Sequence, residues 1–163
     1  MFAQRTSWQL IWWANLLAIP LLSLTGRDMQ QWLLSHVSRE FGAALVFTAL
    51  LLLTLSGVAW LHRATPRWKW HLLWLVLLFI VLPLTLERFE ERTHFLLFGL
   101  LGFASMRLYP PLSALMWVYA LAGGDELLQW LLPQRVGDWH DVYINLLAGS
   151  GGILLAYVGK GRR

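Results

Sequence analysis

The sequence predicts an all-α membrane protein, a polytopic bundle of about six transmembrane helices with a short amphipathic helix on its outer surface. Of its 163 residues, 58% are hydrophobic and only 13% are charged, whereas a soluble domain of this size needs more polar surface. The apolar residues also form continuous blocks of about 17 residues or more, which is long enough to cross the hydrocarbon core of a bilayer as helices. Strands of a membrane barrel would instead alternate polar and apolar residues.

Polar residues, glycine or proline bound each apolar block, so the helices can be placed in order. Gly26 and the charged residue after it are expected to end the first span. The segment 28–40 is too polar to span, but Met29, Trp32 and Val37 recur at helical spacing, which predicts a helix lying flat on the membrane surface. The six expected spans are 7–25, 41–61, 70–86, 91–106, 112–132 and 138–158.

The polar residues divide the chain unevenly. We expect N-terminal transmembrane helices over 1–86, a motif region rich in polar residues over 87–158, and a basic cytoplasmic tail over 159–163. Arg5 precedes the first apolar run as in a signal peptide, but no small-x-small cleavage site follows, so the run is expected to be a retained helix.

The charged residues predict the orientation of the bundle. With six spans, both termini share a side with the second and fourth loops, and this side holds eight of the thirteen Lys and Arg residues: Arg5, Arg63, Arg67, Lys69, Arg107, Lys160, Arg162 and Arg163. Basic residues favour the cytoplasmic side, so both termini are expected in the cytoplasm. All nine Asp and Glu residues fall on the opposite side or in the helix half nearest to it.

Composition also excludes some classes of site and partner. The chain has no cysteine, which excludes disulfides, thiolate metal ligands and cysteine nucleophiles. Its net charge of +4 does not indicate nucleic-acid binding, because no basic stretch is long enough to line a groove for a phosphate backbone.

Polar residues in the last three spans recur at helical spacing, so they share helix faces. Ionisable groups inside a membrane are costly and point to function by default. Helix 91–106 carries one such stripe, helix 112–132 a second and helix 138–158 a third. The three stripes are Glu87, Glu91 and His94; Asp125, Glu126 and Gln129; and Asp138, Asp141, Asn145, Gly149 and Gly152.

Glycines continue the third stripe deeper into the membrane, and small residues let helices approach closely in lipid. Gly149 and Gly152 are therefore expected to seat the last helix against one of the two before it. Gly99 and Gly102 offer a matching small patch on helix 91–106.

Packed together, the three stripes would surround one polar cavity near the outer surface. Its carboxylates, histidine and arginines could perform acid–base chemistry, bind a divalent cation or hold a phosphate head group. We expect acid–base roles for His94, Glu126, Glu91 and Asp141. We expect binding roles for Arg92, Arg135, Asp125, Gln129, Asp138 and Asn145.

A structural interpretation competes with each of these roles. Glu87, Arg88 and Glu90 are typical of solvated helix ends, and His140 is expected at the surface. Asp141 and Asn145 could equally form a network that holds three helices together. Asp125, Glu126 and Gln129 favour function more strongly, because a helix interior is a costly place for three polar residues.

Two motifs resemble a known family. Glu91-Arg92-Thr93-His94-Phe95 with the segment 98–102 is similar to the first motif of VanZ-like membrane proteins. The run 125–149, from Asp125-Glu126 through Asn145 to Gly149, resembles their second motif. Gln134 departs from it, since the family often has glycine between the proline and the arginine. The resemblance covers 87–152, and the first three helices match only in hydrophobicity.

The family takes its name from a protein associated with resistance to the glycopeptide teicoplanin, so the resemblance implies a bacterial inner membrane and a cell-envelope context rather than a reaction. The sequence-based hypothesis is a site at the outer leaflet that binds, and could modify, the head group of a lipid or lipid-linked precursor. One alternative is a non-catalytic protein whose polar cluster clamps helices together. The other is a small-solute transporter, which is weaker because the cytoplasmic halves of the last three helices offer few polar residues. The sequence leaves open whether the protein is an enzyme, whether it uses a cofactor such as a divalent cation, and its oligomeric state.

Overall fold

The computed structural model describes residues 2–132 and 138–160, in which all regular structure is helical. The elements are α1 (Phe2–His36), α2 (Arg39–Ala64), α3 (Lys69–Val76), the π-helix η1 (Leu77–Val81), α4 (Leu82–Leu84), α5 (Arg92–Leu108), α6 (Pro111–Leu131) and α7 (Trp139–Val158). Because α3, η1 and α4 follow one another without a break, the described residues form six helices. The all-helical class is confirmed.

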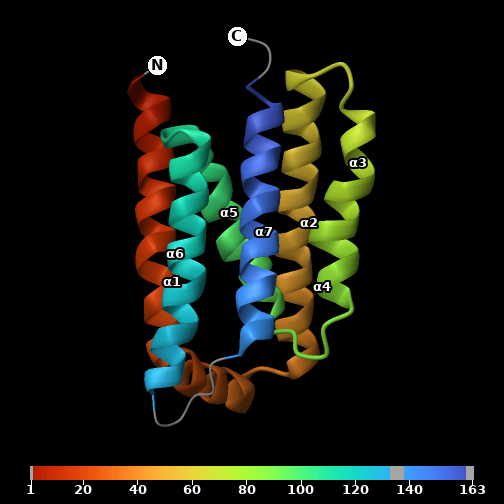
Figure 1. Cartoon of the computed structure of the whole chain (residues 1–163). Coiled ribbons are helices and arrows are strands. Elements are labelled where there is room, and N and C mark those ends of the chain that lie inside the picture. The colour runs from red at the N-terminus through yellow and green to blue at the C-terminus, as the bar shows by residue number, and fades with distance from the viewer. Residues whose placement is uncertain (1, 133–137, 161–163) are drawn as a thin grey trace.

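The helices lie side by side along one axis, and both termini are at the same end of the bundle (Figure 1). Helix α5 is central, because it contacts α1, α2, α6 and α7. Among the described residues, three helical segments are long and apolar enough to cross a membrane, namely Arg5–Gly26, Arg39–Ala64 and Trp139–Val158, and Lys69–Leu84 is a shorter apolar helix.

The prediction that the first helix ends at Gly26 is wrong. Its apolar stretch does end there, but α1 continues to His36, and Figure 1 shows its last turns lying across the lower end of the bundle. A single glycine costs a helix only about 1 kcal/mol and does not stop it. The chain turns afterwards at Ser38, whose hydroxyl caps α2 by accepting the backbone N–H of Phe41.

The π-helical turn η1 adjoins a proline. Pro83 has no N–H to donate to the helix, and the preceding Leu82 N–H bonds to the carbonyl oxygen of Leu77, five residues back. Such wider turns occur mostly as single bulges inside α-helices. This bulge carries Phe79, whose ring packs on Gly99 of α5 and Gly151 of α7.

Glycines bring α5 and α7 into backbone contact. A Cβ atom on Gly102 would overlap the carbonyl oxygen of Gly149, and one on Gly152 would overlap that of Gly99. Only residues without side chains permit so close an approach. The expected match between the two glycine patches is confirmed, and it selects α5 as the partner of α7.

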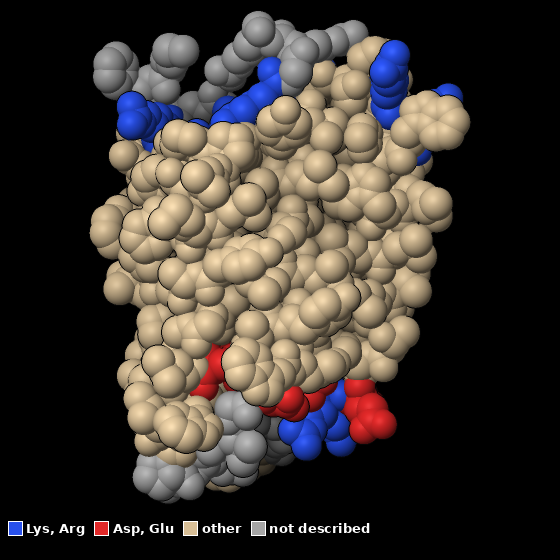
Figure 2. Space-filling view, viewed as in Figure 1, with Lys and Arg blue, Asp and Glu red and all other residues tan. Residues whose placement is uncertain are grey.

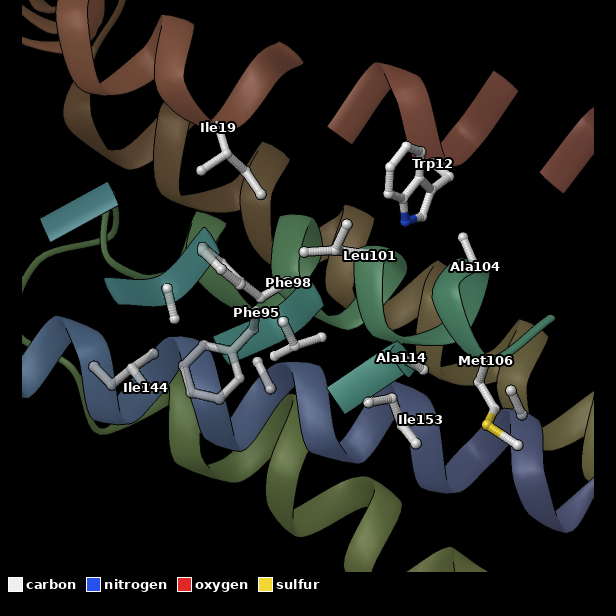
Figure 3. Close-up of a cluster of buried hydrophobic side chains, with 14 of the residues drawn as sticks. Trp12, Ile19, Phe95, Phe98, Leu101, Ala104, Met106, Ala114, Ile144 and Ile153 are labelled. Atoms are coloured by element: carbon white, nitrogen blue, oxygen red, sulfur yellow. The ribbon is translucent and has the colours of Figure 1, made fainter. Parts of the chain in front are cut away.

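The apolar core continues along both sides of this crossing (Figure 3). Phe95, Phe98 and Leu101 project from α5 and are at most 1% exposed. They pack with Trp12 and Ile19 of α1 and with buried residues of α7. The indole N–H of Trp12 also donates to the Ser105 hydroxyl at 3.0 Å, so α1 is joined to α5 by polar as well as apolar contacts.

Charge is divided between the two ends of the bundle. On the face drawn in Figure 2, Asp and Glu side chains gather only toward the lower end, while Lys and Arg occupy the upper end and part of the lower one. We call the end with the chain termini the basic end; it includes Arg5, Arg107 and Lys160. The opposite end, at the start of α5 and α7, is the acidic end.

Candidate functional site

Helices α5 and α7 bring His94 and Asn145 together near the acidic end. The Nδ1 atom of His94 lies 2.7 Å from Oδ1 of Asn145, whose side chain is fully buried. Because the amide oxygen can only accept, His94 carries its proton on Nδ1 in this arrangement, which leaves the Nε2 lone pair as a base. The ring stacks parallel to Phe98, with centroids 6.3 Å apart, so its orientation is held on two sides.

Helix α6 supplies a second polar group, in which two adjacent carboxyl groups are buried. Asp125 is 5% exposed and Glu126 is 6% exposed. The Gln129 amide donates to Glu126 Oε1 at 3.2 Å and to Asp125 Oδ2 at 3.4 Å. The hydroxyl of Ser23 in α1 donates to Asp125 Oδ1. Hydrogen bonds therefore offset part of the cost of burying these carboxyl groups.

Glu126 also joins α6 to the start of α7. Its Oε2 accepts the backbone N–H of Asp138 at 2.9 Å. Asp138 is the N-cap of α7, with its own carboxylate accepting the N–H of His140 at 2.9 Å. This is the usual role of an aspartate at a helix N-terminus.

Asp141, in the first turn of α7, is coupled electrostatically to one carboxyl group of α6 and to one at the start of α5. Its charge acts on Glu91, at the start of α5, and on Glu126. Burial, followed by repulsion from Asp141, raises the pKa of Glu91 above its ordinary value, although Arg88 opposes the shift. The carboxyl groups of three helix ends thus form one crowded, negative cluster.

The remaining predicted site residues lie at the edge of this cluster or beyond it. Arg92 Nη2 donates to the carbonyl oxygen of Leu86 at 3.0 Å, so this part of the guanidinium ties α5 to the loop after α4. Its Nε is buried without a partner among the described residues.

Two other predicted residues do not enter the cluster as the structure describes it. Arg135 lies outside the described residues. His140 is exposed, as expected, with Nδ1 3.9 Å from the Asp141 carboxylate.

Ser23 is the site residue that sequence reasoning missed, because the first helix was treated as apolar scaffold. A signal for it exists. Trp12, Asn15, Ile19 and Ser23 follow spacings of three, four and four, which places them on one face of a helix. All four are buried, so this face of α1 contributes two polar residues to the interior.

Within the described residues, no group of three His, Asp or Glu side chains is arranged to hold a metal ion. His94 and Asn145 face one another, and the carboxyl groups of Asp125 and Glu126 accept hydrogen bonds from within the protein. These side chains are thus engaged in hydrogen bonds within the protein.

The fold and this cluster define the class of the chain: a helical membrane protein with a buried polar cluster near one end of its bundle. A family model described as VanZ/LLP1 matches residues 3–160, and the chain belongs to this family. The match confirms the resemblance and extends it from 87–152 to the first three helices. Searches of curated proteins and of solved structures found no match.

Proposed function

We propose that the polar cluster binds the head group of a lipid or lipid-linked cell-envelope precursor at the extracytoplasmic face of the bacterial inner membrane. The basic end, rich in Lys and Arg, would face the cytoplasm, which puts the acidic end at the outer leaflet. The observation that carries the proposal is the hydrogen bond between His94 and Asn145. It orients a histidine base close to the carboxyl group of Glu91, and in the proposed orientation this end of the bundle would meet lipid head groups.

The chemistry of the cluster defines the kind of head group it would accept. Carboxyl groups and the His94 Nε2 lone pair accept hydrogen bonds, so they suit ammonium, amide or sugar hydroxyl groups. A bare phosphate would be repelled by the negative charge of Asp141 and Glu91. Arg92 could hold the phosphate of such a head group through the N–H groups that do not bond Leu86.

The same residues would carry an acid–base step if the head group is modified. His94 Nε2 is the candidate base, because the bond from Nδ1 to Asn145 defines its tautomer. Glu126 is the candidate acid, since it is buried and close to the charge of Asp141. Asp125, Gln129, Asp138 and Asn145 would position these two groups rather than exchange protons.

Binding can be measured on the purified protein in a mild detergent. A polyprenyl phosphate carrying an amino sugar is the probe, and a bare polyprenyl phosphate and a phosphatidylcholine are the comparison lipids. We expect native mass spectrometry to show retention of the amino-sugar lipid in preference to both. His94→Gln and Glu126→Gln should each weaken retention about tenfold or more, equivalent to about 1.4 kcal/mol, while Glu87→Gln at the exposed loop should not. Equal retention of all three lipids would overturn the proposal.

A structural clamp is the second candidate, and one observation favours it. The bonds of Asp125 to Ser23 and of Glu126 to the Asp138 backbone join α1, α6 and α7. If clamping is the whole role, Glu126→Gln lowers the melting temperature without lipid and leaves lipid retention by the folded protein unchanged. If binding is the role, Glu126→Gln weakens lipid retention by the folded protein, whether or not its melting temperature changes.

A further inference from the structure

The turn that joins α2 to α3 takes no part in the polar cluster and carries three cations. Arg63 lies in the last turn of α2, Arg67 in the connection and Lys69 at the first residue of α3. All three residues are exposed. Figure 1 shows this turn at the end of the bundle that also carries both termini, which is the basic end.

Local contacts hold the turn in one compact form. The Thr65 hydroxyl accepts the backbone N–H of Arg67 at 3.2 Å, and the Thr65 carbonyl oxygen accepts that of Trp68 at 3.3 Å. Across the turn, the rings of His62 and Trp68 meet edge to face, with centroids 5.1 Å apart. The residue that follows each of these two rings in the chain is a cation, so the positive charges gather on one small surface.

No carboxylate neutralises this surface in the part of the chain that the structure describes. The segment 62–71 contains neither Asp nor Glu. Among the described residues, the side chains of Arg63, Arg67 and Lys69 form no ion pair or hydrogen bond with the rest of the protein. Their charges are therefore available to an anion outside the chain.

The cations also oppose the dipole of α3. The N-terminus of a helix carries partial positive charge, which nearby acidic residues stabilise. The first turn of α3 has no acidic residue and begins at Lys69, and Trp68 before it supplies no side-chain cap. Positive charges thus meet the positive end of the helix, and an anion bound there would relieve the repulsion.

The exposed indole of Trp70 indicates the surroundings of the turn. Its side chain is 82% exposed, at the start of the apolar helix Lys69–Leu84, and the helix before the turn is long and apolar enough to cross a membrane. A turn between two such helices lies at a bilayer surface, where indoles are favoured. The anions present at that surface are the head groups of acidic phospholipids.

We propose that the α2–α3 turn binds the head groups of anionic phospholipids in the leaflet at the basic end. Arg63, Arg67 and Lys69 would attract the phosphates, and Trp70 would lie among the lipid groups just beneath them. A free phosphate would satisfy the charges but would leave the indole in water. Setting the topology of the chain requires only its positive charge, so lipid binding by the folded protein is a separate role. It does not depend on the function proposed for the polar cluster.

The test measures the ligand concentration that gives half of the maximal rise in melting temperature of the purified protein in detergent. The probes are phosphatidylglycerol, phosphatidylcholine with the same chains, and inorganic phosphate. Phosphatidylglycerol should act at concentrations at least about tenfold lower than phosphatidylcholine, and inorganic phosphate should have no effect. Salt at about 1 M should remove most of the preference, because it screens exposed charges. Equal responses to the two phospholipids, or a response to inorganic phosphate, would overturn the proposal.

Variants test whether the turn itself is the site. Arg67→Gln with Lys69→Gln should remove most of the preference for phosphatidylglycerol, whereas the charge-retaining pair Arg67→Lys with Lys69→Arg should keep it. The matched control is Arg5→Gln with Lys160→Gln, which removes two exposed cations from the same end and should also keep it. An unchanged preference in the first variant, or an equal loss in the matched control, refutes the turn as the binding site.

Discussion

The imidazole Nδ1 of His94 and the amide Oδ1 of Asn145 lie 2.7 Å apart although 51 residues separate them in the chain. The contact exists because α5 and α7 cross at glycines, which brings the polar ends of both helices together. It defines which nitrogen of His94 carries the proton, and thus which nitrogen can act on a ligand.

Replacement of Asn145 by alanine should change the tautomer of His94. Without the amide oxygen, Nδ1 loses its acceptor, and the Nε2–H form becomes more populated. The ¹⁵N chemical shifts of histidine-labelled protein measure this, with His94→Gln identifying the signal. We also expect a loss of about 1–3 kcal/mol in unfolding free energy, the cost of a missing partner in a buried hydrogen bond. An unchanged tautomer in the variant would contradict the assigned proton position.

The crossing of α5 and α7 should not tolerate a single methyl group. In Gly102→Ala, the new Cβ meets the backbone of Gly149, which cannot move aside as a side chain would. We expect a loss of about 3 kcal/mol, the upper end of the cost of overpacking, measured by thermal unfolding in detergent. Gly123→Ala is the matched control, because nothing lies within 4 Å of a Cβ there. That control should gain roughly 0.5–1 kcal/mol, since alanine favours a helix.

Ser23 should be coupled to Asp125. Ser23→Ala removes the hydroxyl that donates to the buried carboxyl group and should cost about 1–3 kcal/mol. A double-mutant cycle with Asp125→Asn should show that the two losses are not additive. Thr25→Ala serves as the control, because its exposed hydroxyl bonds only to its own helix, at Leu21. Additive losses would mean that the two residues do not interact.

Glu91 should make stability depend on pH. Its pKa is raised by burial and by Asp141, so the folded state favours the protonated carboxyl group. This residue therefore contributes less to stability as pH rises through its folded pKa. Glu91→Gln removes the charge, so the stability of the variant relative to wild type should increase as pH rises from the ordinary glutamate pKa of 4.5 toward neutrality. Melting temperatures over this range test the trend, with Glu87→Gln as the exposed control, and a difference that does not vary with pH would refute it.

Much of the fold follows from the order of apolar and polar residues. Six spans and a separate short surface helix were predicted, and the ends of the last five spans agree with the structure within a few residues, because proline and charged residues stop apolar blocks at recognisable places. The first helix was the exception. Gly26 was expected to end it, yet helix propensity is a weak influence that neighbouring turns override.

The candidate site could be predicted only in part. Helical spacing placed Asp125, Glu126 and Gln129 on one turn, and the structure buries all three. The contribution of α1 was not predicted, because one serine in an apolar helix gives little signal of its own. Ser23 becomes recognisable only when the buried stripe through Asn15 is followed along the helix.

By itself, the sequence determined the helical class, the positions of most helices, the separation of charge between the two ends and the residues that share each helix face. These are local properties, set by hydrophobicity and by the 3.6-residue period of the helix. The tertiary structure decided which faces meet: His94 with Asn145, and Ser23 with Asp125. Partners so distant in the chain depend on how whole helices pack, and spacing within one helix carries no information about its neighbours.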